Sequence, residues 1–555
     1  MKKVKILLLL ALTLVVSSFL AACGTGNDDA AQGGSDDAAK DVPQVLNILE
    51  TAEIPTMDTV MGTDAVAFNV ANQVFEGLYR LDENNNAVEG MAIDHEVSED
   101  GTVYTFNLRE DAKWSNGDPV TADDFVFAWR RAVTPETGSE YGPYMMSGVI
   151  VNATQVAAGE VAPEELGVKA IDATTLEVTL ERPVPYFDSL MTFPTFYPQN
   201  EKFVTEQGEN YALETENLLY NGPFVLSNWE HEVGWKMEKN ADYWDADVVT
   251  LEEINVKVVK DPATSVSLYD TGKIDISGAL SSEFVDKYKT HEDFMSYGEP
   301  TIFWFKYNQT KNKALANEDV RRALSMAIDK QGMSDVILNN GSIPANYAVP
   351  KDFVKHPETK EDFRAANGDF NTYNVEEAQK FWKQGLETLG LTEVTIEILG
   401  GDTETAVKMQ EFIKNQLETN LEGLTIDLKN VPFKQRLDLD TAMDYDIQLA
   451  GWAPDYLDPM TFADLWVTDG GNNKTGYSNP EYDRLINEAK TTLSGDPVAR
   501  FEAMQEAERI LLEEDAAVGP LYQRGTSQLM QEYVKNVYIH SFGPDYSYKW
   551  TKIEK

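Results

Sequence analysis

The residues best placed for chemistry lie in the stretch LAGWAPDYLDP, residues 449–459, where a strand-like run ends at a proline and an aspartate follows a tryptophan. A carboxylate in a loop beside an aromatic ring can bind a cation, and an ammonium group suits it because that group offers three hydrogen-bond donors. The alternative is that Asp455 caps a turn, as an aspartate near a proline commonly does. Taken alone, these residues leave both interpretations open.

Residues of the kinds that enzymes use are present, but they are scattered. The sequence contains no H-x-x-x-H pair, G-x-S-x-G elbow, P-loop or G-x-G-x-x-G motif. The acidic runs 82–87 and 438–443 lack the glycine that a calcium-binding loop requires at its sixth position. We therefore expect a binding protein and not an enzyme, with no cofactor and no metal. The histidines that form no cluster are His95, His231, His291, His356 and His540.

The charge of the chain excludes one class of function. It has 93 acidic residues against 46 basic ones, for a formal net charge of −47. A nucleic-acid-binding protein needs positive charge to neutralise phosphates, so that class is excluded. The same acidity favours solubility and repels anionic membranes and polymers.

The first forty residues predict a lipid anchor. A lysine-rich start precedes the apolar run 6–16, which is too short for a comfortable membrane span, and then comes Leu-Ala-Ala-Cys23 with the only cysteine of the sequence. This order matches a bacterial lipoprotein signal over residues 1–22, with Cys23 lipidated and residues 23–41 forming a flexible tether. The alternative is an ordinary secretory signal with a chance cysteine. We expect the protein on the extracytoplasmic face of the cell membrane, as on a Gram-positive cell surface.

Strand and helix patterns alternate along the rest of the chain. Residues 102–109, 175–180 and 301–307 read as strands. Helix starts with capping residues follow Thr121, Asn317, Asn479 and Asp496. With 555 residues and no internal repeat, the chain predicts a mixed α/β protein of more than one domain.

Residues 97–131, VSEDGTVYTFNLREDAKWSNGDPVTADDFVFAWRR, closely resemble the signature segment of extracytoplasmic solute-binding proteins, family 5, which serve peptide ABC importers. The oligopeptide-binding branch of that family has the Gly-Trp-x-x-Asp pattern found at 451–455. Further segments are similar, so the resemblance covers essentially the whole mature chain: residues 75–82, 167–187, 220–226 and 316–330.

The resemblance implies an α/β, bilobal, periplasmic-binding-protein-like clamp of type II, in its three-domain peptide-receptor variety, with the ligand cleft between the lobes. Domain I is expected to be discontinuous, with domain II inserted into it and domain III forming the facing lobe. The implied limits are 42–75, 199–300 and 526–555 for domain I, 76–198 for domain II, and 301–525 for domain III.

The resemblance also implies roles for single residues. Asp455 would bind the α-ammonium group of a peptide, and Gly451 to Ala453 would pair with the peptide backbone. Thr63 to Ala65 would pair with it from the other lobe. The aromatic residues would line side-chain pockets, although packing in the core is the alternative for them. The implied peptide-binding residues are Asp455, Gly451, Trp452, Ala453, Thr63, Asp64, Ala65, Tyr141 and Phe433.

The chain departs from the best-known receptors where these grip the peptide carboxylate with basic side chains. The aligned residues here are Leu338, Ala406, Asp440 and Leu449, and none is basic. We therefore expect the peptide's carboxyl end to be held weakly and the length selection to be loose or shifted to longer peptides.

The expected partners are oligopeptides and the membrane permease of an ABC importer, and the protein is expected to be a monomer. The alternatives within the family are receptors for a signalling peptide, a dipeptide or a non-peptide ligand such as nickel or haem. Outside the family, a lipid-anchored hydrolase and a surface adhesin or chaperone stay open.

Overall fold

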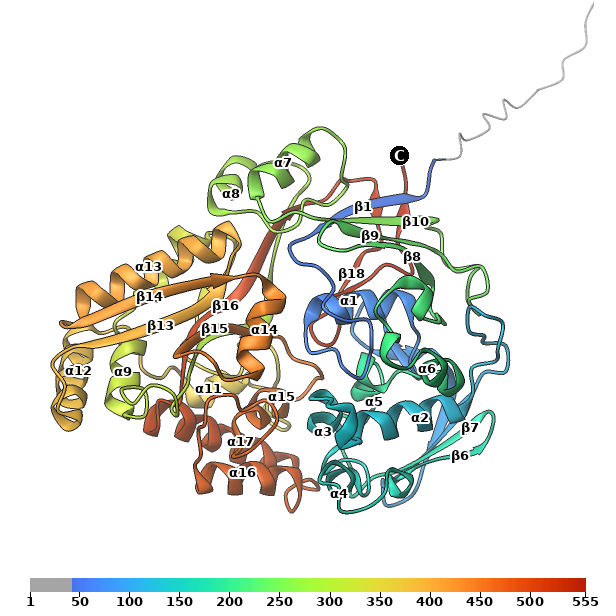
Figure 1. Ribbon diagram of the computed structural model, residues 1–555, viewed down its shortest axis with the longest axis horizontal. Coiled ribbons are helices and arrows are strands. Elements are labelled where there is room, and N and C mark those ends of the chain that lie inside the picture. The colour runs from blue at the N-terminus through green and yellow to red at the C-terminus, as the bar shows by residue number, and fades with distance from the viewer. Residues whose placement is uncertain (1–41) are drawn as a thin grey trace, which may run out of the picture. The chain divides into compact units, whose positions relative to one another are not determined.

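The computed structural model describes residues 42–555 (Figure 1). The predicted signal, Cys23 and the tether lie outside the described residues. The folded part contains three sheets of four or more strands, which we call the first, second and third sheet in the order in which the chain begins them.

The first sheet has four strands drawn from two distant parts of the chain. The N-terminal strand β1 runs parallel to β10, and the other pairs are antiparallel. Helix α1 (Ala65–Val74) follows β1 and packs beside β8. The strand order is β1 (Val45–Glu50), β10 (Glu253–Val258), β9 (Gly234–Lys239) and β8 (Phe224–Glu230).

The second sheet is antiparallel throughout and is formed by consecutive segments. Helix α2 (Ala122–Val133) packs on it and begins with the predicted capping box, in which Thr121 and Asp124 bond each other's backbone. The predicted strands over 102–109 and 175–180 are confirmed as β5 and β7. The strand order is β4 (Ala92–Val97), β5 (Val103–Leu108), β7 (Thr175–Thr179) and β6 (Val168–Asp172).

The third sheet has six strands and is the largest. The predicted strand over 301–307 is the second half of β11, which runs on through a register shift between Gly298 and Ile302. The strand order is β12 (Ile343–Pro344), β16 (Val518–Leu529), β11 (Phe294–Tyr307), β15 (Ile447–Trp452), β13 (Val394–Gly401) and β14 (Leu424–Val431).

Helices cover the third sheet and extend below it in the view of Figure 1. The predicted starts at Asn317, Asn479 and Asp496 are confirmed, because each side chain accepts a hydrogen bond from the first turn of its helix. The principal helices are α9 (Glu318–Met326), α12 (Val375–Leu389), α13 (Glu404–Asn420), α14 (Phe433–Thr441), α16 (Pro480–Lys490) and α17 (Pro497–Arg509).

Shorter elements complete the two lobes. The first lobe consists of the first and second sheets with their helices, and the second lobe consists of the third sheet with its helices. Further helices are α3 (Tyr141–Met146), α4 (Ala153–Ala157), α5 (Phe187–Leu190), α6 (Glu201–Gln207), α7 (Pro262–Asp270), α8 (Ser282–Tyr288), α10 (Lys330–Gly332), α11 (Phe363–Asn367) and α15 (Met460–Ala463). Small strand pairs are β2 (Tyr79–Leu81) with β3 (Ala87–Glu89), β17 (Val534–Lys535) with β20 (Lys552–Ile553), and β18 (Tyr538–Ile539) with β19 (Tyr546–Ser547).

Two large hydrophobic clusters stabilise the lobes. One contains Leu46 of the first sheet and Phe106 of the second, and it continues to Phe501 of α17. The other is formed by side chains that pack between the third sheet and its covering helices, with Ile398 and Ile413 among its members. Burial of such apolar surface is the main force that holds sheets and helices together.

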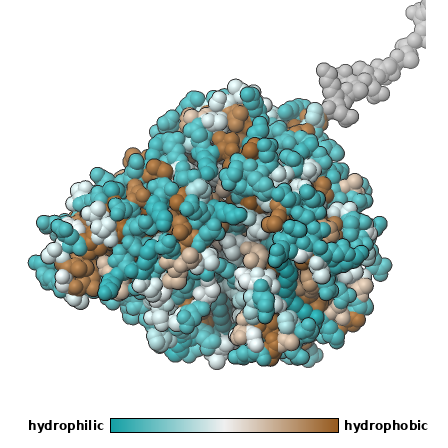
Figure 2. Space-filling model, viewed as in Figure 1, coloured by the Kyte–Doolittle hydropathy of each residue, from teal (hydrophilic) through white to brown (hydrophobic). Residues whose placement is uncertain are grey.

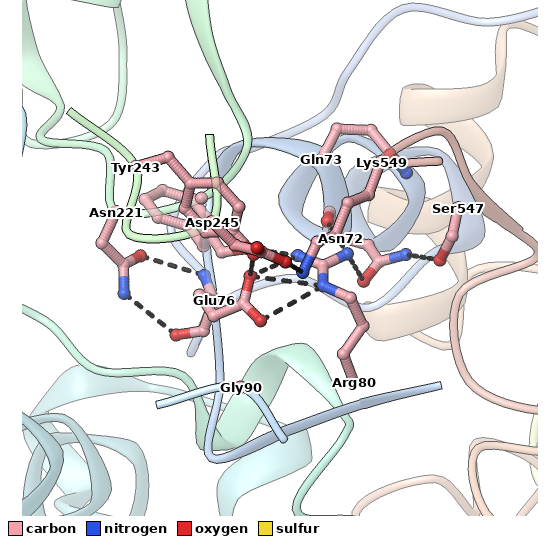
Figure 3. Close-up of polar contacts among 12 residues, drawn as sticks. Asn72, Gln73, Glu76, Arg80, Gly90, Asn221, Tyr243, Asp245, Ser547 and Lys549 are labelled. Atoms are coloured by element: carbon pink, nitrogen blue, oxygen red, sulfur yellow. Dashed lines mark hydrogen bonds and ion pairs between the residues drawn. The ribbon is translucent and has the colours of Figure 1, made fainter. Parts of the chain in front are cut away.

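A buried polar network joins segments that are far apart in the sequence (Figure 3). Glu76 is fully buried and forms an ion pair of 2.9 Å with Arg80. Arg80 also donates to the carbonyl of Asn72, while Tyr243 donates to Glu76 at 2.8 Å. Burial opposes ionisation of Glu76, but Arg80 and Lys549 outweigh it and lower the pKa of the Glu76 carboxyl. The network fixes α1, the segment before β10 and the C-terminal tail against one another.

Candidate functional site

Strand β15 has a free edge at its carboxyl end. It pairs with β11 along its whole length, from Ile447 to Trp452, but with β13 only at Ile447 and Gln448. No other strand within residues 42–555 pairs with the edge from Leu449 onward. Unpaired backbone N–H and C=O groups of this kind are a template for an added strand.

Gly451 lies in the middle of that edge and its backbone is exposed. A Cβ atom at this position would lie 2.6 Å from the ring of Phe303, the residue opposite it on β11. Phe303 in turn stacks on Tyr522 with ring centroids 4.7 Å apart. The packing of the neighbouring strand therefore requires glycine here, in addition to any approach of a ligand backbone.

Asp455 follows β15 after Ala453 and Pro454, and only 5% of its surface is exposed. Its backbone N–H donates to the hydroxyl of Thr461 at 3.0 Å, but its Oδ2 atom is buried without a hydrogen-bond partner in the described part of the chain. Burial raises the pKa of the carboxyl well above its usual range, and the hydroxyls of Tyr144 and Tyr141 lower it only in part. The turn-capping alternative does not describe this side chain.

The capping role belongs to a neighbour. Asp458 accepts a hydrogen bond from the backbone N–H of Met460 at 2.9 Å, and it forms a buried ion pair of 2.7 Å with Arg500. The loop therefore holds two buried aspartates of different kinds. Asp458 is paired within the protein, whereas the Oδ2 atom of Asp455 has no hydrogen-bond partner among residues 42–555.

Aromatic rings from both lobes surround Asp455. Trp452 of the second lobe stacks on Tyr141 of the first, with centroids 6.1 Å apart and the rings 15° from parallel. Tyr144, also on α3, meets the same indole edge-on and donates a hydrogen bond of 3.1 Å to the carbonyl of Thr461. The structure thus brings together two of the predicted pocket residues, Tyr141 and Trp452.

The segment Thr63–Ala65 approaches from the first lobe. Asp64 has an extended backbone and caps α1, with its Oδ1 atom accepting from the N–H of Ala67 at 3.0 Å. Ala65 is already the first helical residue, so the extended part of the predicted pairing segment ends at Asp64.

The second oxygen of Asp64 resembles that of Asp455. Its Oδ2 atom is buried and accepts no hydrogen bond from residues 42–555, and burial raises the pKa of the carboxyl to about 6. Both carboxylates raise the pKa of the buried Tyr141 hydroxyl, after the larger effect of burial. The hydroxyl of Tyr141 is therefore close to both acidic groups.

Phe433, the last predicted pocket residue, begins α14 and is partly buried. The guanidinium of Arg436, one turn further along the helix, lies 5.1 Å from the centre of its ring. Arg436 was not predicted from the sequence, because nothing in the spacing of α14 indicates that it meets β15. Lys306 of β11 was not predicted either, and it pairs with Asp440 of α14 at 2.6 Å.

The two lobes touch around this region. Glu140 of the first lobe lies 3.3 Å from Lys474 and 3.1 Å from the hydroxyl of Thr441 in the second. Tyr186 and Tyr456 stack across the interface with centroids 4.6 Å apart. The contacts describe a closed arrangement of the lobes.

Other features of the described residues lie elsewhere. Within residues 42–555, no cluster of histidine, cysteine or acidic side chains has the geometry of a metal site, and no helix is long and apolar enough to cross a membrane. A surface cavity of about 580 Å³ opens beside Tyr79, Trp244 and Trp550, and none of the predicted peptide-binding residues lines it. The free edge of β15 and the buried Asp455 stay the best candidate site.

Comparison with known proteins identifies relatives over almost the whole chain. The family described as "Bacterial extracellular solute-binding proteins, family 5 Middle" matches residues 86–474. A dipeptide-binding protein of Lactococcus lactis is 32% identical over 562 residues, covering 99% of each chain. The structure of Listeria monocytogenes OppA bound to peptide is 48% identical, with a TM-score of 0.89, and covers 92% of this chain and 99% of that one.

Two structures of the Escherichia coli murein tripeptide binding protein MppA bear on the arrangement of the lobes. One superimposes with a TM-score of 0.82 at 26% identity, covering 92% of this chain and 98% of that one. The other, described as an unliganded open form, gives only 0.61 at 27% identity, with 92% and 97% covered. The arrangement of the lobes in the present structure is therefore unlike that open form.

Proposed function

Because the chain belongs to the bacterial extracellular solute-binding proteins, family 5, we propose that it is a lipid-anchored receptor that captures oligopeptides outside the cell and delivers them to an ABC importer. The observation that carries the proposal is the free edge of β15 beside Asp455, whose buried Oδ2 atom has no hydrogen-bond partner among residues 42–555.

An ammonium group supplies what Asp455 lacks. A buried unpaired carboxylate is costly, and a group with three donors and the opposite charge removes that cost when water is excluded. The amino terminus of a peptide carries such a group at neutral pH, since its usual pKa is about 7.7 to 8. We therefore assign Asp455 to the α-ammonium group.

The peptide backbone would extend the third sheet. From Leu449 to Trp452, β15 presents an edge that pairs with no other strand of residues 42–555, and Ala453 continues the chain toward Asp455. Thr63 and Asp64 offer extended backbone from the first lobe. Pairing through backbone groups gives affinity without reading side chains, which suits a receptor that accepts many sequences. Trp452, Tyr141 and Phe433 then contact side chains of the peptide.

A ligand held by both lobes stabilises their closed arrangement. Its binding free energy differs between the open and closed states, and moving a clamp from mostly open to mostly closed takes about 5.5 kcal/mol of such difference. The proposed hinge lies near residues 300 and 525, where β11 and β16 cross between the proposed domains I and III. The register shift between Gly298 and Ile302 falls at the predicted limit of domain III, which supports the proposed limits.

Attachment and partners follow from the sequence and the relatives. Cys23 would carry the lipid and residues 24–41 would tether the folded part to the extracytoplasmic membrane face, where the permease lies. A solved relative is described as an oligopeptide ABC transporter substrate-binding domain from Bacillus anthracis, 46% identical, with a TM-score of 0.90 and coverage of 92% and 99%. We propose the same transport role here, with the protein acting as a monomer.

The test combines a protein change with a ligand change. Isothermal titration with short peptides is expected to show that Asp455→Asn and N-acetylation each lower affinity about 10- to 100-fold. Because both remove one contact, the two losses should not add. Asp438→Asn, an exposed aspartate on α14, is the matched control. Unchanged affinity in both arms would overturn the proposal, and recovery of cleaved peptides would favour a hydrolase instead.

A further inference from the structure

Arg436 stands at the inner end of the free edge of β15. Its Nη1 atom donates a hydrogen bond of 2.9 Å to the carbonyl of Leu449, the first residue of β15 beyond the pairing with β13. Asp455 lies past the other end of the same edge. The exposed part of the strand is therefore bounded by an anionic group at one end and a cationic group at the other.

The guanidinium of Arg436 forms no ion pair with any residue that the structure describes. The nearest acidic neighbour on its own helix, Asp440, is already paired with Lys306 at 2.6 Å. No carboxylate of residues 42–555 forms an ion pair with Arg436. The Asp64 carboxylate of the facing lobe interacts with the guanidinium electrostatically, but one of its oxygens caps α1. Burial lowers the pKa of the guanidinium, and Asp440, Tyr522 and Asp64 oppose this only in part.

The distance along the strand sets the register of a ligand. A peptide whose amino group is at Asp455 must run back along β15, antiparallel to it, to reach Leu449. An extended chain advances about 3.4 Å per residue, so the carboxyl end of a third or fourth residue lies roughly 10 to 14 Å from the amino group. This span matches the stretch of β15 between Ala453 and Leu449.

We propose that Arg436 binds a carboxylate of the bound peptide at its third or fourth residue. The carboxylate can be the C-terminus of a tripeptide or tetrapeptide, or the side chain of an acidic residue in a longer peptide. The planar guanidinium can bind either carboxylate through a pair of hydrogen bonds, while the ring of Phe433 packs against the guanidinium. This inference rests on the proposed function and makes Arg436 a specificity-determining residue of the same site.

The proposal changes the expectation drawn from the aligned positions. Leu338, Ala406, Asp440 and Leu449 carry no positive charge, and that had predicted a weakly held carboxyl end. The structure brings a cation to the carbonyl of Leu449 from helix α14 instead. We now expect a preference for a carboxylate at a fixed distance from the amino group.

The test compares peptides that differ only in this charge. Isothermal titration would use tri- and tetra-alanine as free acids and as C-terminal amides, and alanine hexapeptide amides with Glu or Gln at position three or four. For the unmodified protein, we expect the carboxylate forms to bind about 10- to 100-fold more tightly than their neutral partners. The comparison of free acids with amides measures binding of a terminal carboxylate, and the comparison of Glu with Gln peptides measures binding of an acidic side chain.

Arg436→Met should abolish the difference in affinity between charged and neutral peptides. Arg436→Lys should restore part of the difference, because lysine keeps the charge but not the paired geometry. Lys434→Met, an exposed cation on the same helix, is the matched control. Thermal melts of each variant check folding.

Two results would overturn the inference. One is an equal loss of affinity for charged and neutral peptides in Arg436→Met, which would mean that the residue only supports β15. The other is the absence of any charge preference in the unmodified protein. If that protein binds no peptide at all, the proposed function itself fails, so the two failures are distinguishable.

Discussion

At the scale of single residues, the proposed site is defined by charged groups that the described part of the chain leaves unpaired. Among residues 42–555, Asp455 and Asp64 each keep one buried oxygen without a partner, and Arg436 forms no ion pair. Buried polar groups in folded proteins nearly always have partners, and the exceptions commonly mark function. Asp458 and Arg500, paired within the same loop region, show what the ordinary arrangement is.

The ionic contact predicts a bell-shaped dependence of peptide affinity on pH. Asp455 must be ionised and the amino group protonated, so affinity should fall in acid as the Asp455 carboxyl, whose pKa burial raises, takes up a proton. It should fall again above about pH 8, where the α-amino group loses its charge. Titration calorimetry between pH 4 and 10 measures both limbs. In Asp455→Asn the acidic limb should flatten, and an unchanged limb would contradict the assignment.

Gly451 predicts an effect on stability. Gly451→Ala places a Cβ atom 2.6 Å from the ring of Phe303, and the stacking on Tyr522 keeps that ring from moving freely. We expect a loss of about 1 to 3 kcal/mol in the free energy of unfolding, measured by urea denaturation. Phe303→Leu should recover part of the loss in the double variant. Gly495→Ala, where no atom lies within 4 Å, is the control and should be nearly neutral.

At the scale of elements, buried pairing between distant segments holds the first lobe together. Arg80 and Glu76 are 2% and 0% exposed, and they link α1 to the segment before β10 through Tyr243. Arg80→Met leaves Glu76 buried and unpaired, so unfolding free energy should fall by about 3 to 5 kcal/mol. Arg484→Met on α16 removes only exposed ion pairs and should change it by less than about 1 kcal/mol. Equal effects would show that the buried network does not stabilise this lobe.

Local sequence signals predicted the elements well where one short segment decides the outcome. Capping residues such as Asn479 and Asp496 mark helix starts because their side chains bond the next turn. Strand β11 was predicted only over 301–307, since the aromatic alternation stops there and its first half depends on pairing with β16. Arg436 could not be predicted as part of the site, because its contact with Leu449 comes from the packing of α14 on the third sheet.

At the scale of the whole molecule, contacts around the rim connect the two lobes in the closed arrangement. The viewed face is largely hydrophilic, with hydrophobic residues scattered over it (Figure 2), in keeping with the net charge of −47. Between the lobes, by contrast, the contacts include stacked aromatic rings and the ion pair of Glu140 with Lys474. The family resemblance predicted a bilobal clamp, but only the packed structure identifies the residues that hold it shut.

The rim contact predicts a change in affinity without a change in folding. Glu140→Ala removes the partner of Lys474 and Thr441, which exists only when the lobes touch. Peptide affinity should fall by up to about fivefold, the value of a partly exposed ion pair of roughly 1 kcal/mol. The melting temperature without ligand should stay the same. Glu160→Ala, exposed on the same lobe, serves as the control, and an equal loss in both variants would contradict the role of the rim.

The stacked pair of Trp452 and Tyr141 has one further consequence. The indole N–H of Trp452 is buried and has no hydrogen-bond partner among the residues that the structure describes. The indole belongs to one lobe, while the tyrosine ring stacked on it belongs to the other. Any separation of the lobes exposes that indole to water, and this exposure shifts its fluorescence emission to longer wavelength. The protein thus carries a built-in optical reporter of its own closure, readable without a label by subtracting the spectrum of Trp452→Phe.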